Sequence, residues 1–378
     1  MQPRLALCGN VFPADGPGAV LAALRGPVRA WTDGLKAAGQ VGPFGFGLHF
    51  SASAAAEIAA SKPLLLEIKQ AMADADVTSW TANAFPFGDF HASLVKESAF
   101  LPDWSSPKRS EFTMQVAHLL AELAPDDDRP LSISTCPIGY GTAALEHPDT
   151  LKHLLFTAAC LQHLGKQYRR DFILAIEPEP DGNFERVSEL ATWLYRHIPA
   201  DLLPQLGVCW DLCHGAVVGE SAAEILETLH NTGVRVGKVQ ISSALAIPGN
   251  PKAESLALLR SLTADPYLHQ VRGEDPKGVA SSTPDMPAFL ELPDAFQWSN
   301  LRVHCHVPVS RSEYPGGLQG TPWKQAVSQC LNAGIRDFEL ETYTLPVLPA
   351  EFLAERGEVG TMVDESLSCI QALKLDTR

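Results

Sequence analysis

The stretch FILAIEPEPDGNFERVSELATWLYRHIPADLLPQLGVCWDLCH, residues 172–214, contains the unit that decides the fold. It begins with an apolar run at 172–176 and reaches a second one at 206–210, with a helix-like segment between them. Both runs are apolar at successive positions, which is typical of strands buried on both faces. The unit therefore predicts two parallel strands joined by a helix.

Working outward from this unit, the same alternation recurs along the chain and predicts an α/β fold. We expect barrel strands at 4–8, 44–50, 77–84, 131–136, 172–177, 206–211, 235–241 and 335–341. Helices are expected at 17–39, 52–74, 110–124, 149–168, 183–197, 221–231 and 322–333. The first strand is followed by CGNVFP and not by a GxGxxG fingerprint, which disfavours a nucleotide-binding open sheet. Eight units predict one (β/α)8 TIM-barrel domain over residues 1–378, since such barrels need about 250 residues before insertions.

Composition narrows the class of protein. The chain is 46% hydrophobic and 19% charged, which predicts a large folded core. Its net charge of −15 repels phosphate backbones, so we expect no nucleic-acid partner. No apolar run approaches the roughly 18–20 residues of a membrane span, and the apolar stretch in MQPRLALCGN is too short for a signal peptide. We expect a cytoplasmic protein with no membrane insertion that acts on a small molecule.

The connection between the seventh and eighth expected strands is unusually long, about 90 residues from 241 to 335. Residues 248–300 are rich in Pro, Gly, Ser and Asp. We expect an insertion over the barrel mouth at 244–307, with 267–272 pairing with 301–308, because long loops of this kind are usually functional or mobile. The alternative is a disordered surface excursion.

Polar residues collect at the expected strand ends. Glu177 closes FILAIE, Asp211 closes LGVCWD, Gln240 ends the next strand and Glu341 closes DFELE. All strand ends of a barrel open onto one face, where active sites lie. Such an oxygen-rich set suits Mg²⁺, Mn²⁺ or Co²⁺, and an added imidazole makes Zn²⁺ plausible. His214, three residues after Asp211, can contact the same metal or the substrate; the alternative role of these residues is helix capping.

Two histidines in RVHCHVP, His304 and His306, alternate by two positions, so both would face one side of a strand. Paired imidazoles on one face are a recognised metal-binding arrangement. The alternative is a hairpin with partly buried histidines. A hydrolase of the amidohydrolase kind uses such a pair on its first strand, and here the pair comes late. His269, in the same long connection, is a further candidate for the pocket.

Three other residues are candidates for substrate contact. Glu179, in EPEP, would share a face with Glu177 if the strand continued, although its prolines oppose continued pairing. Asn83 and His91 follow the third expected strand, in NAFPFGDFH.

The pattern of a strand ending in Glu177, the DxxH of Asp211 and His214, and the final ETYT strand with Glu341 resembles the xylose isomerase-like TIM-barrel superfamily. That group includes ketose 3-epimerases, inosose isomerases and dehydratases, and endonuclease IV. The motifs CGNVFP, NAFPFGDFH, PDW (102–104), EPEP, GVCWDLCH, KVQISSAL, YLHQV, VHCHVP and ELETYT are more specifically similar to the metabolite traffic protein EboE family of bacterial Ebo clusters.

This resemblance implies a metal held at Glu177, Asp211, Gln240 and Glu341. Gln240 departs from the histidine usual at its position, and His304 or His306 can supply the missing imidazole, with His306 the preferred metal ligand and His304 at the substrate. The resemblance also implies a sugar or cyclitol substrate and other Ebo cluster proteins as partners, without naming a reaction.

Three functions remain open from the sequence. The first is a metal-dependent isomerase, epimerase or dehydratase, in which Glu177 and Glu341 exchange protons at adjacent carbons of a sugar or cyclitol. The second is a metal-dependent hydrolase or phosphodiesterase resembling endonuclease IV, which would want more histidines on early strands. The third is a non-catalytic carrier of a metabolite, which the replacement by Gln240 favours and the intact carboxylates oppose.

Overall fold

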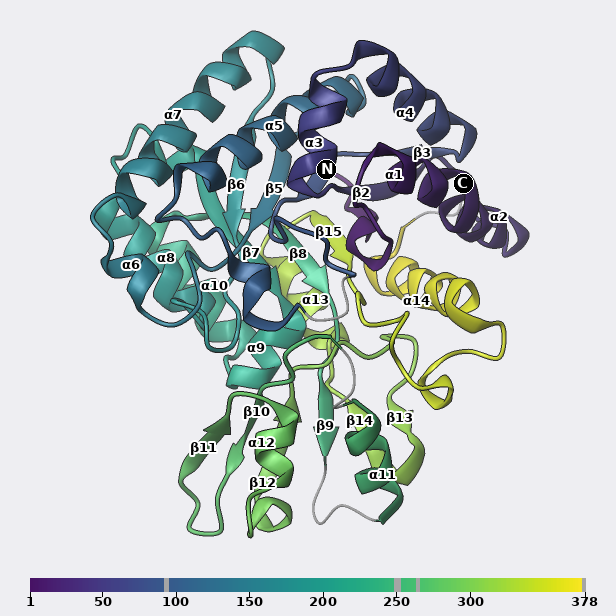
Figure 1. Cartoon of the computed structure of the whole chain (residues 1–378), viewed down its shortest axis with the longest axis vertical. Coiled ribbons are helices and arrows are strands. Elements are labelled where there is room, and N and C mark those ends of the chain that lie inside the picture. The colour runs from purple at the N-terminus through teal and green to yellow at the C-terminus, as the bar shows by residue number, and fades with distance from the viewer. Residues whose placement is uncertain (92–94, 248–252, 263–265, 376–378) are drawn as a thin grey trace.

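The computed structural model describes residues 1–91, 95–247, 253–262 and 266–375. Its centre is a closed ring of parallel strands surrounded by helices (Figure 1), as the sequence predicts. The ring closes because β1 pairs with both β2 and β15. Its strands are β1 (Arg4–Cys8), β2 (Phe44–His49), β3 (Val77–Thr78), β4 (Thr81–Asn83), β5 (Leu131–Thr135), β6 (Phe172–Ile176), β7 (Leu206–Asp211), β8 (Arg235–Ile241) and β15 (Asp337–Leu340).

The helices of the barrel lie on the outside of this ring (Figure 1). They are α1 (Pro17–Ala23), α2 (Arg29–Ala37), α3 (Ala52–Ala59), α4 (Lys62–Asp74), α5 (Pro107–Leu123), α6 (Ala143–Glu146), α7 (Thr150–Tyr168), α8 (Val187–His197), α9 (Leu212–Val218), α10 (Ala222–Thr232), α13 (Lys324–Asn332) and α14 (Gly357–Leu373). Within the described ranges, no helix is both long enough and apolar enough to cross a membrane.

Three expected elements are interrupted in the structure. The helix expected at 17–39 is broken by a π-turn at Leu24–Val28, which contains Pro27, a residue without the N–H that a regular helix needs. The helix expected at 52–74 divides into α3 and α4, and Ser61 caps the second of these. The strand expected at 77–84 divides into β3 and β4, where the hydroxyl of Ser79 donates to the carbonyl of Phe46 at 2.6 Å.

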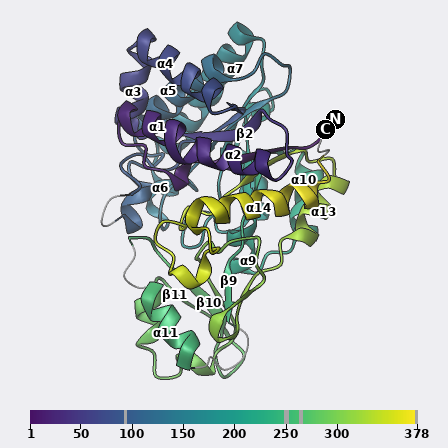
Figure 2. The same cartoon turned by 90° about the vertical axis from the view of Figure 1, so that its right-hand side faces the viewer.

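A second sheet, antiparallel, lies at one end of the barrel (Figure 2). It is built from β9 (Leu245–Ile247), β10 (Val271–Glu274), β11 (Ala280–Thr283), β12 (Ser299–Val303), β13 (Glu313–Tyr314) and β14 (Leu318–Gly320), and carries α11 (Ala253–Ser261) and α12 (Met286–Leu290). Val271 and Arg272 pair with Val303 and Arg302, inside the two segments expected to pair. The sheet continues to β14, beyond the expected insertion boundary at 307, and residues 248–252 and 263–265 of that insertion lie outside the described residues.

The apolar core is shared by the barrel and the second sheet. Ile133 and Leu174 of the barrel belong to the same buried cluster as Val271, Phe289 and Val303 of the sheet. This continuity holds the segment around His304 and His306 against the barrel. The insertion is therefore packed as part of the fold over the described ranges.

The interior of the barrel also holds one buried ion pair. Lys238 of β8 and Glu339 of β15 are both fully buried, and their Nζ and Oε2 atoms lie 2.5 Å apart. Gly47 of β2 leaves the space that Glu339 needs, because a Cβ there would come within 1.8 Å of its Oε1. Side chains alternate along a strand, so Gln240 and Glu341 face the same interior, nearer the strand ends.

Candidate metal centre

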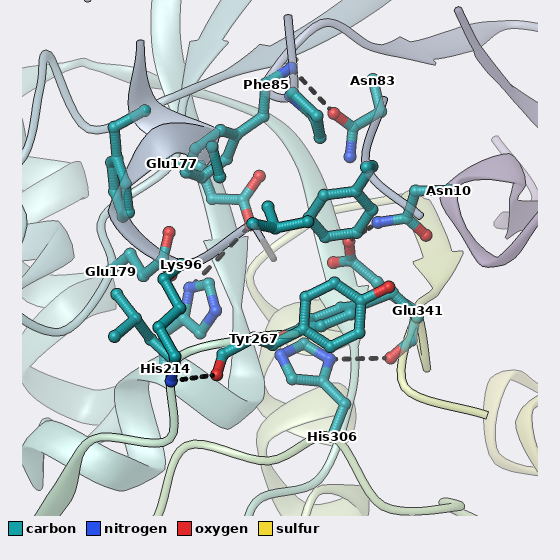
Figure 3. A pocket seen from close by; sticks show the side chains of 17 residues that line it. Asn10, Asn83, Phe85, Lys96, Glu177, Glu179, His214, Tyr267, His306 and Glu341 are labelled. Atoms are coloured by element: carbon teal, nitrogen blue, oxygen red, sulfur yellow. Dashed lines mark hydrogen bonds and ion pairs between the residues drawn. The ribbon is translucent and has the colours of Figure 1, made fainter. Parts of the chain in front are cut away.

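A pocket opens at the carboxyl ends of the barrel strands, with about 530 Å³ of space free of protein atoms (Figure 3). It is lined both by strand-end residues and by the long insertion, which contributes Tyr267, Leu268 and His306. The full lining is Asn10, Asn83, Phe85, Pro86, Phe90, Val95, Lys96, Ala99, Phe100, Glu177, Glu179, His214, Tyr267, Leu268, His306, Glu341 and Tyr343.

The structure brings three predicted carboxylates together beside this pocket. Glu177, Asp211 and Glu341 each place one carboxylate oxygen within 4.8 Å of the others. Their exposed fractions are only 3%, 2% and 4%. Glu177 and Glu341 come directly after β6 and β15 and each extends its strand by one hydrogen bond, to the carbonyls of Thr135 and Ile241. We call these three residues the carboxylate group.

The carboxylate group is electrostatically strained when it holds no cation. Burial, together with the neighbouring charge of Asp211, raises the pKa of Glu177 to about 8. Burial and the charges of Glu177 and Asp211 raise the pKa of Glu341 well above its ordinary value. The cation of Lys238 opposes both shifts but is paired with Glu339. Three carboxylates buried so close together need either bound protons or a cation to offset their charge.

The hydrogen bonds of the group leave oxygens available for a ligand. Asn10 donates to Oε1 of Glu341 at 2.5 Å, and Ser242 donates to Oδ2 of Asp211 at 2.8 Å. Oε2 of Glu177 and Oε2 of Glu341 are buried and have no hydrogen-bond partner among the described residues. Buried polar atoms without partners are rare and costly, and oxygen donors of this kind suit a divalent cation.

Three histidines lie against the carboxylate group with their rings in mutual contact. The ring centroid of His214 lies 4.6 Å from that of His304 and 5.5 Å from that of His306. The Nδ1 atoms of His214 and His306 lie 2.9 Å and 3.1 Å from the backbone carbonyls of Pro178 and Glu341. A carbonyl only accepts, so each Nδ1 carries the proton and each Nε2 keeps its lone pair.

Burial favours the neutral form of His304 and His306. Burial lowers the pKa of His306 to about 4 and that of His304 well below its ordinary value. The Nε2 atoms of His304 and His306 are buried without a partner among the described residues. Neutral imidazoles with Nδ1 held and Nε2 free are the form in which histidine binds metals.

Side chains of the histidines and carboxylates form overlapping sets of potential ligands. Asp211, His214 and His306 form one set, with donor atoms within 4.8 Å of one another. Further sets at this spacing are Glu179, His214 and His304, and Cys213, His304 and His306. Glu177, Asp211 and Glu341 are therefore close enough to share a cation, whereas His306 meets this spacing with Asp211 and His214.

Gln240, the remaining predicted ligand, is fully buried in the register position opposite Asp211. Its Oε1, the atom that would bind a metal, accepts the thiol of Cys209 at 3.1 Å, and its Nε2 has no partner among the described residues. The thiol uses one of the two lone pairs of this oxygen, and the role of Gln240 as a metal ligand stays a prediction.

The predicted substrate contacts divide into two kinds. Asn83, Glu179 and His214 line the pocket. His91 and His269 lie outside its lining: Nε2 of His91 is 2.9 Å from the carbonyl of Asn10, and Nδ1 of His269 is 2.8 Å from the carbonyl of His304. These two histidines hold the backbone of residues at the site, because their ring nitrogens are directed at carbonyl oxygens.

His304, also predicted to contact substrate, lies behind the pocket wall. It is 1% exposed and is absent from the lining, although its ring packs on that of His214. Its donor atom lies within 4.8 Å of those of His214 and Glu179, which do line the pocket.

Sequence reasoning missed several residues of the site. Asn10 holds Glu341, and its only signal was its place directly after the first strand, in CGN. Tyr267 and Tyr343 stack edge to face at 5.0 Å and form an aromatic wall with Phe90. Lys96 reaches the pocket rim, where it pairs with Asp285 at 2.5 Å. The two tyrosines stood in the YLHQV and ELETYT motifs, which indicated no role for them, and Lys96 stood in none of the quoted motifs.

Comparison with solved structures places the fold among xylose isomerase-like TIM barrels. One match is a xylose isomerase-like TIM-barrel protein from Mycobacterium smegmatis in complex with magnesium: 12% identity, TM-score 0.52, covering 98% of this chain and 96% of that one. Another is an IOLI protein with a binding zinc atom: 9% identity, TM-score 0.50, and 98% of both chains. At such identities the similarity shows the fold alone.

A weaker match is an AP endonuclease, family 2, from Brucella melitensis, with 15% identity and a TM-score of 0.38 over 63% of this chain and 79% of that one. No protein-family model matches the chain, and no curated protein matches it in sequence. The narrower resemblance to the EboE family finds no support in these comparisons and stays a prediction.

Proposed function

We propose that this chain is a divalent-metal-dependent isomerase or epimerase, or a dehydratase built from the same parts, acting on a small sugar or cyclitol derivative. One observation carries the proposal: Glu177 and Glu341, from strands on different parts of the ring, face one small pocket. Each has a buried oxygen without a hydrogen-bond partner among the described residues. Two carboxylates that can each take or give a proton are what exchange of hydrogen at neighbouring carbons requires.

The residues present fit a cation at this site. Glu177, Asp211 and Glu341 would hold it, and His306, which is grouped with Asp211, is the nearest predicted imidazole ligand. When bound, a divalent cation supplies Lewis acidity toward the substrate's carbonyl or hydroxyl oxygens. Oxygen ligands favour Mg²⁺ or Mn²⁺, and an imidazole extends the range to Co²⁺ and Zn²⁺.

The chain's own residues prepare the two carboxylates for proton transfer. Asn10 fixes one oxygen of Glu341, and the other has no hydrogen-bond partner in the described part of the chain. Burial raises the pKa of Glu177 to about 8, and a nearby cation acts in the opposite direction. The proposal requires that the balance of the two effects leave this carboxylate able to take a proton near neutral pH. Such matching to the working pH is what general-base catalysis requires.

The pocket walls suit a compact polyhydroxylated ring. Phe90 and Tyr343 present apolar surface, while Asn10 and Asn83 contribute amide groups. Small-molecule sites commonly combine apolar walls with a few placed polar groups. The resemblance of the sequence to the EboE family narrows the proposed substrate to a sugar or cyclitol derivative handled with other Ebo cluster proteins.

The test is hydrogen exchange with solvent. Purified chain, loaded with Mn²⁺, Mg²⁺, Co²⁺ or Zn²⁺, is incubated in D₂O with inososes, ketoses and their phosphates and followed by NMR. Deuterium uptake at carbon that disappears in Glu177→Gln and Glu341→Gln supports the proposal. Binding of a panel compound without exchange, in all metals, would instead support the non-catalytic carrier.

A second candidate is a metal-dependent hydrolase, and the histidine cluster is the observation that favours it. His214, His304 and His306 supply more imidazole than an isomerase of the expected kind needs. The net charge of −15 opposes a nucleic-acid substrate, so small phosphodiesters are the appropriate panel. Release of a phosphomonoester from such compounds, without exchange at carbon, would favour this candidate over the first.

A further inference from the structure

A second set of potential ligands lies beside the carboxylate group and shares no residue with it. Glu179, His214 and His304 each place one donor atom within 4.8 Å of the others. They come from three parts of the chain: the EPEP segment after β6, the first turns of α9, and the insertion after β12. We call these three residues the histidine group.

The two imidazoles of the histidine group are both oriented through Nδ1, which leaves Nε2 as the ring nitrogen that carries a lone pair. Nδ1 of His304 lies 2.7 Å from Oε1 of Gln270, whose own Nε2 donates to the carbonyl of Pro180 at 3.0 Å. Nδ1 of His214 is held by the carbonyl of Pro178. Nε2 of His304 is buried and has no partner among the described residues.

One short segment therefore organises the whole group. EPEP, residues 177–180, contributes the carboxylate of Glu179 and, on either side of it, the two carbonyls that orient the imidazoles. Outer hydrogen bonds of this kind fix the tautomer and direction of metal-binding histidines. A cluster that served only packing would gain nothing from them, because apolar side chains fill buried space without an unpaired nitrogen.

The carboxylate group does not need these residues. His306 belongs to a set with Asp211 and His214, so it can supply an imidazole on the side of Asp211. If His306 completes the carboxylate group, then Glu179, His214 and His304 remain together, and each side chain is used once.

We propose that Glu179, His214 and His304 bind a second divalent cation, and that its class is zinc-like. Two imidazole nitrogens and one carboxylate are a ligand set that zinc favours, whereas an all-oxygen set suits Mg²⁺ or Mn²⁺. Glu179 and His214 line the pocket, so a substrate bearing several hydroxyl or phosphate oxygens can reach this cation as well as the first. The inference does not require the chain to be an isomerase.

The test is a zinc count on the full chain. Protein stripped with a chelator is saturated with Zn²⁺, freed of excess metal and analysed for zinc and protein. We expect about two zinc ions per chain in the wild type and about one in His304→Gln or His214→Gln. His163→Ala, which removes an exposed histidine of α7, is the matched control and should keep the wild-type count. Circular dichroism and a melting curve of the zinc-free proteins verify folding.

A second measurement keeps the test decisive if a histidine variant fails to fold. The variant Glu177→Gln/Glu341→Gln removes the first cation, and X-ray absorption of its remaining zinc should report about two imidazole ligands. A wild-type count of one, or a remaining zinc with oxygen ligands only, overturns the second site. If the zinc counts are as expected but no hydrogen exchange at carbon is found, the isomerase proposal is rejected and the second cation site is still supported.

Discussion

The carboxylate group and the histidine group lie side by side but are built in different ways. Glu177, Asp211 and Glu341 occupy equivalent places at the ends of barrel strands, so the repeat of the fold alone brings them together. The histidine group depends on the insertion: His304 reaches the site only because β12 pairs with β10 and the second sheet packs on the barrel core.

The two groups also differ in how their atoms are oriented. The carboxylates extend the barrel's own strands, and strand pairing positions them. The imidazoles are directed by acceptors on other segments, such as Pro178 and Gln270. The strand–helix repeat of the barrel therefore positions the carboxylate group directly. The histidine group depends on long-range contacts, and single substitutions can remove these one at a time. The predictions below test the carboxylate group, the histidine group, or the contacts that support them.

The largest expected effect is on catalysis by the carboxylate group. Glu177→Gln should lower the rate of hydrogen exchange by a factor on the order of 10² to 10⁴, because general-base action is lost. The free energy of unfolding should not fall, since the substitution also removes a buried negative charge beside Asp211. NMR exchange rates and urea unfolding measure the two quantities.

Glu227→Gln provides the control for this change, since it removes an exposed carboxylate of α10. It should alter neither quantity. If Glu177→Gln unfolds the protein while retaining its exchange rate per folded molecule, Glu177 is a structural residue.

The next largest effect is on stability, through the ion pair beneath the site. Lys238→Met should lower the free energy of unfolding by about 3–5 kcal/mol, because Glu339 is left buried without a partner. Lys238→Met/Glu339→Met should recover most of this loss. Urea unfolding of metal-free protein checks both, and equal losses in the single and double variants would contradict the explanation.

A smaller effect concerns the joint between the two regions. Glu365 of α14 accepts from the backbone N–H of Val309, in the insertion, at 2.9 Å, and from Thr342, beside the carboxylate group, at 2.7 Å. Burial raises the pKa of Glu365 from an ordinary 4.5 to about 7. The folded state thus holds this proton more tightly than the unfolded state does, so stability should fall as pH rises from about 4.5 to about 7.

Glu365→Gln should remove that part of the pH dependence and be the more stable protein at pH 8, by about 1–3 kcal/mol. Urea midpoints at pH 5 and pH 8 measure the difference. Parallel profiles for the two proteins would mean that Glu365 ionises in the folded state as it does in water.

The smallest expected effects form a reciprocal pair. Ser242→Ala removes a hydrogen-bond donor to Asp211 and should lower the affinity of the carboxylate group for its cation by about tenfold. Gln270→Met removes the acceptor that holds Nδ1 of His304 and should lower the affinity for the proposed second cation by a similar factor. Metal titration by calorimetry resolves the two steps. Weakening of both steps by either variant would show that the groups form one site.

The strand pattern predicted the barrel well because strands buried on both faces are recognisable from short apolar runs. It predicted element breaks poorly. The segment 77–84 reads as one strand, yet Ser79 gives its hydroxyl to Phe46 on the neighbouring strand. The segment 52–74 reads as one helix, yet it restarts at Ser61. The first break has a hydrogen bond from Ser79, and the second has the cap of Ser61 together with Pro63 in the first turn of α4, and hydrophobic periodicity reveals neither.

The sequence by itself determined the closed barrel and the nearness of Glu177, Asp211 and Glu341, because residues at the ends of parallel strands must meet at one face. Only the tertiary structure decided the rest of the site. Asn10 contacts Glu341, which is far from it in the sequence, and His304 reaches the site because the second sheet packs on the barrel. The side chain of Gln240 is directed at Cys209. Such pairings depend on how loops pack over the mouth, and packing is a property of the whole folded chain that local sequence does not encode.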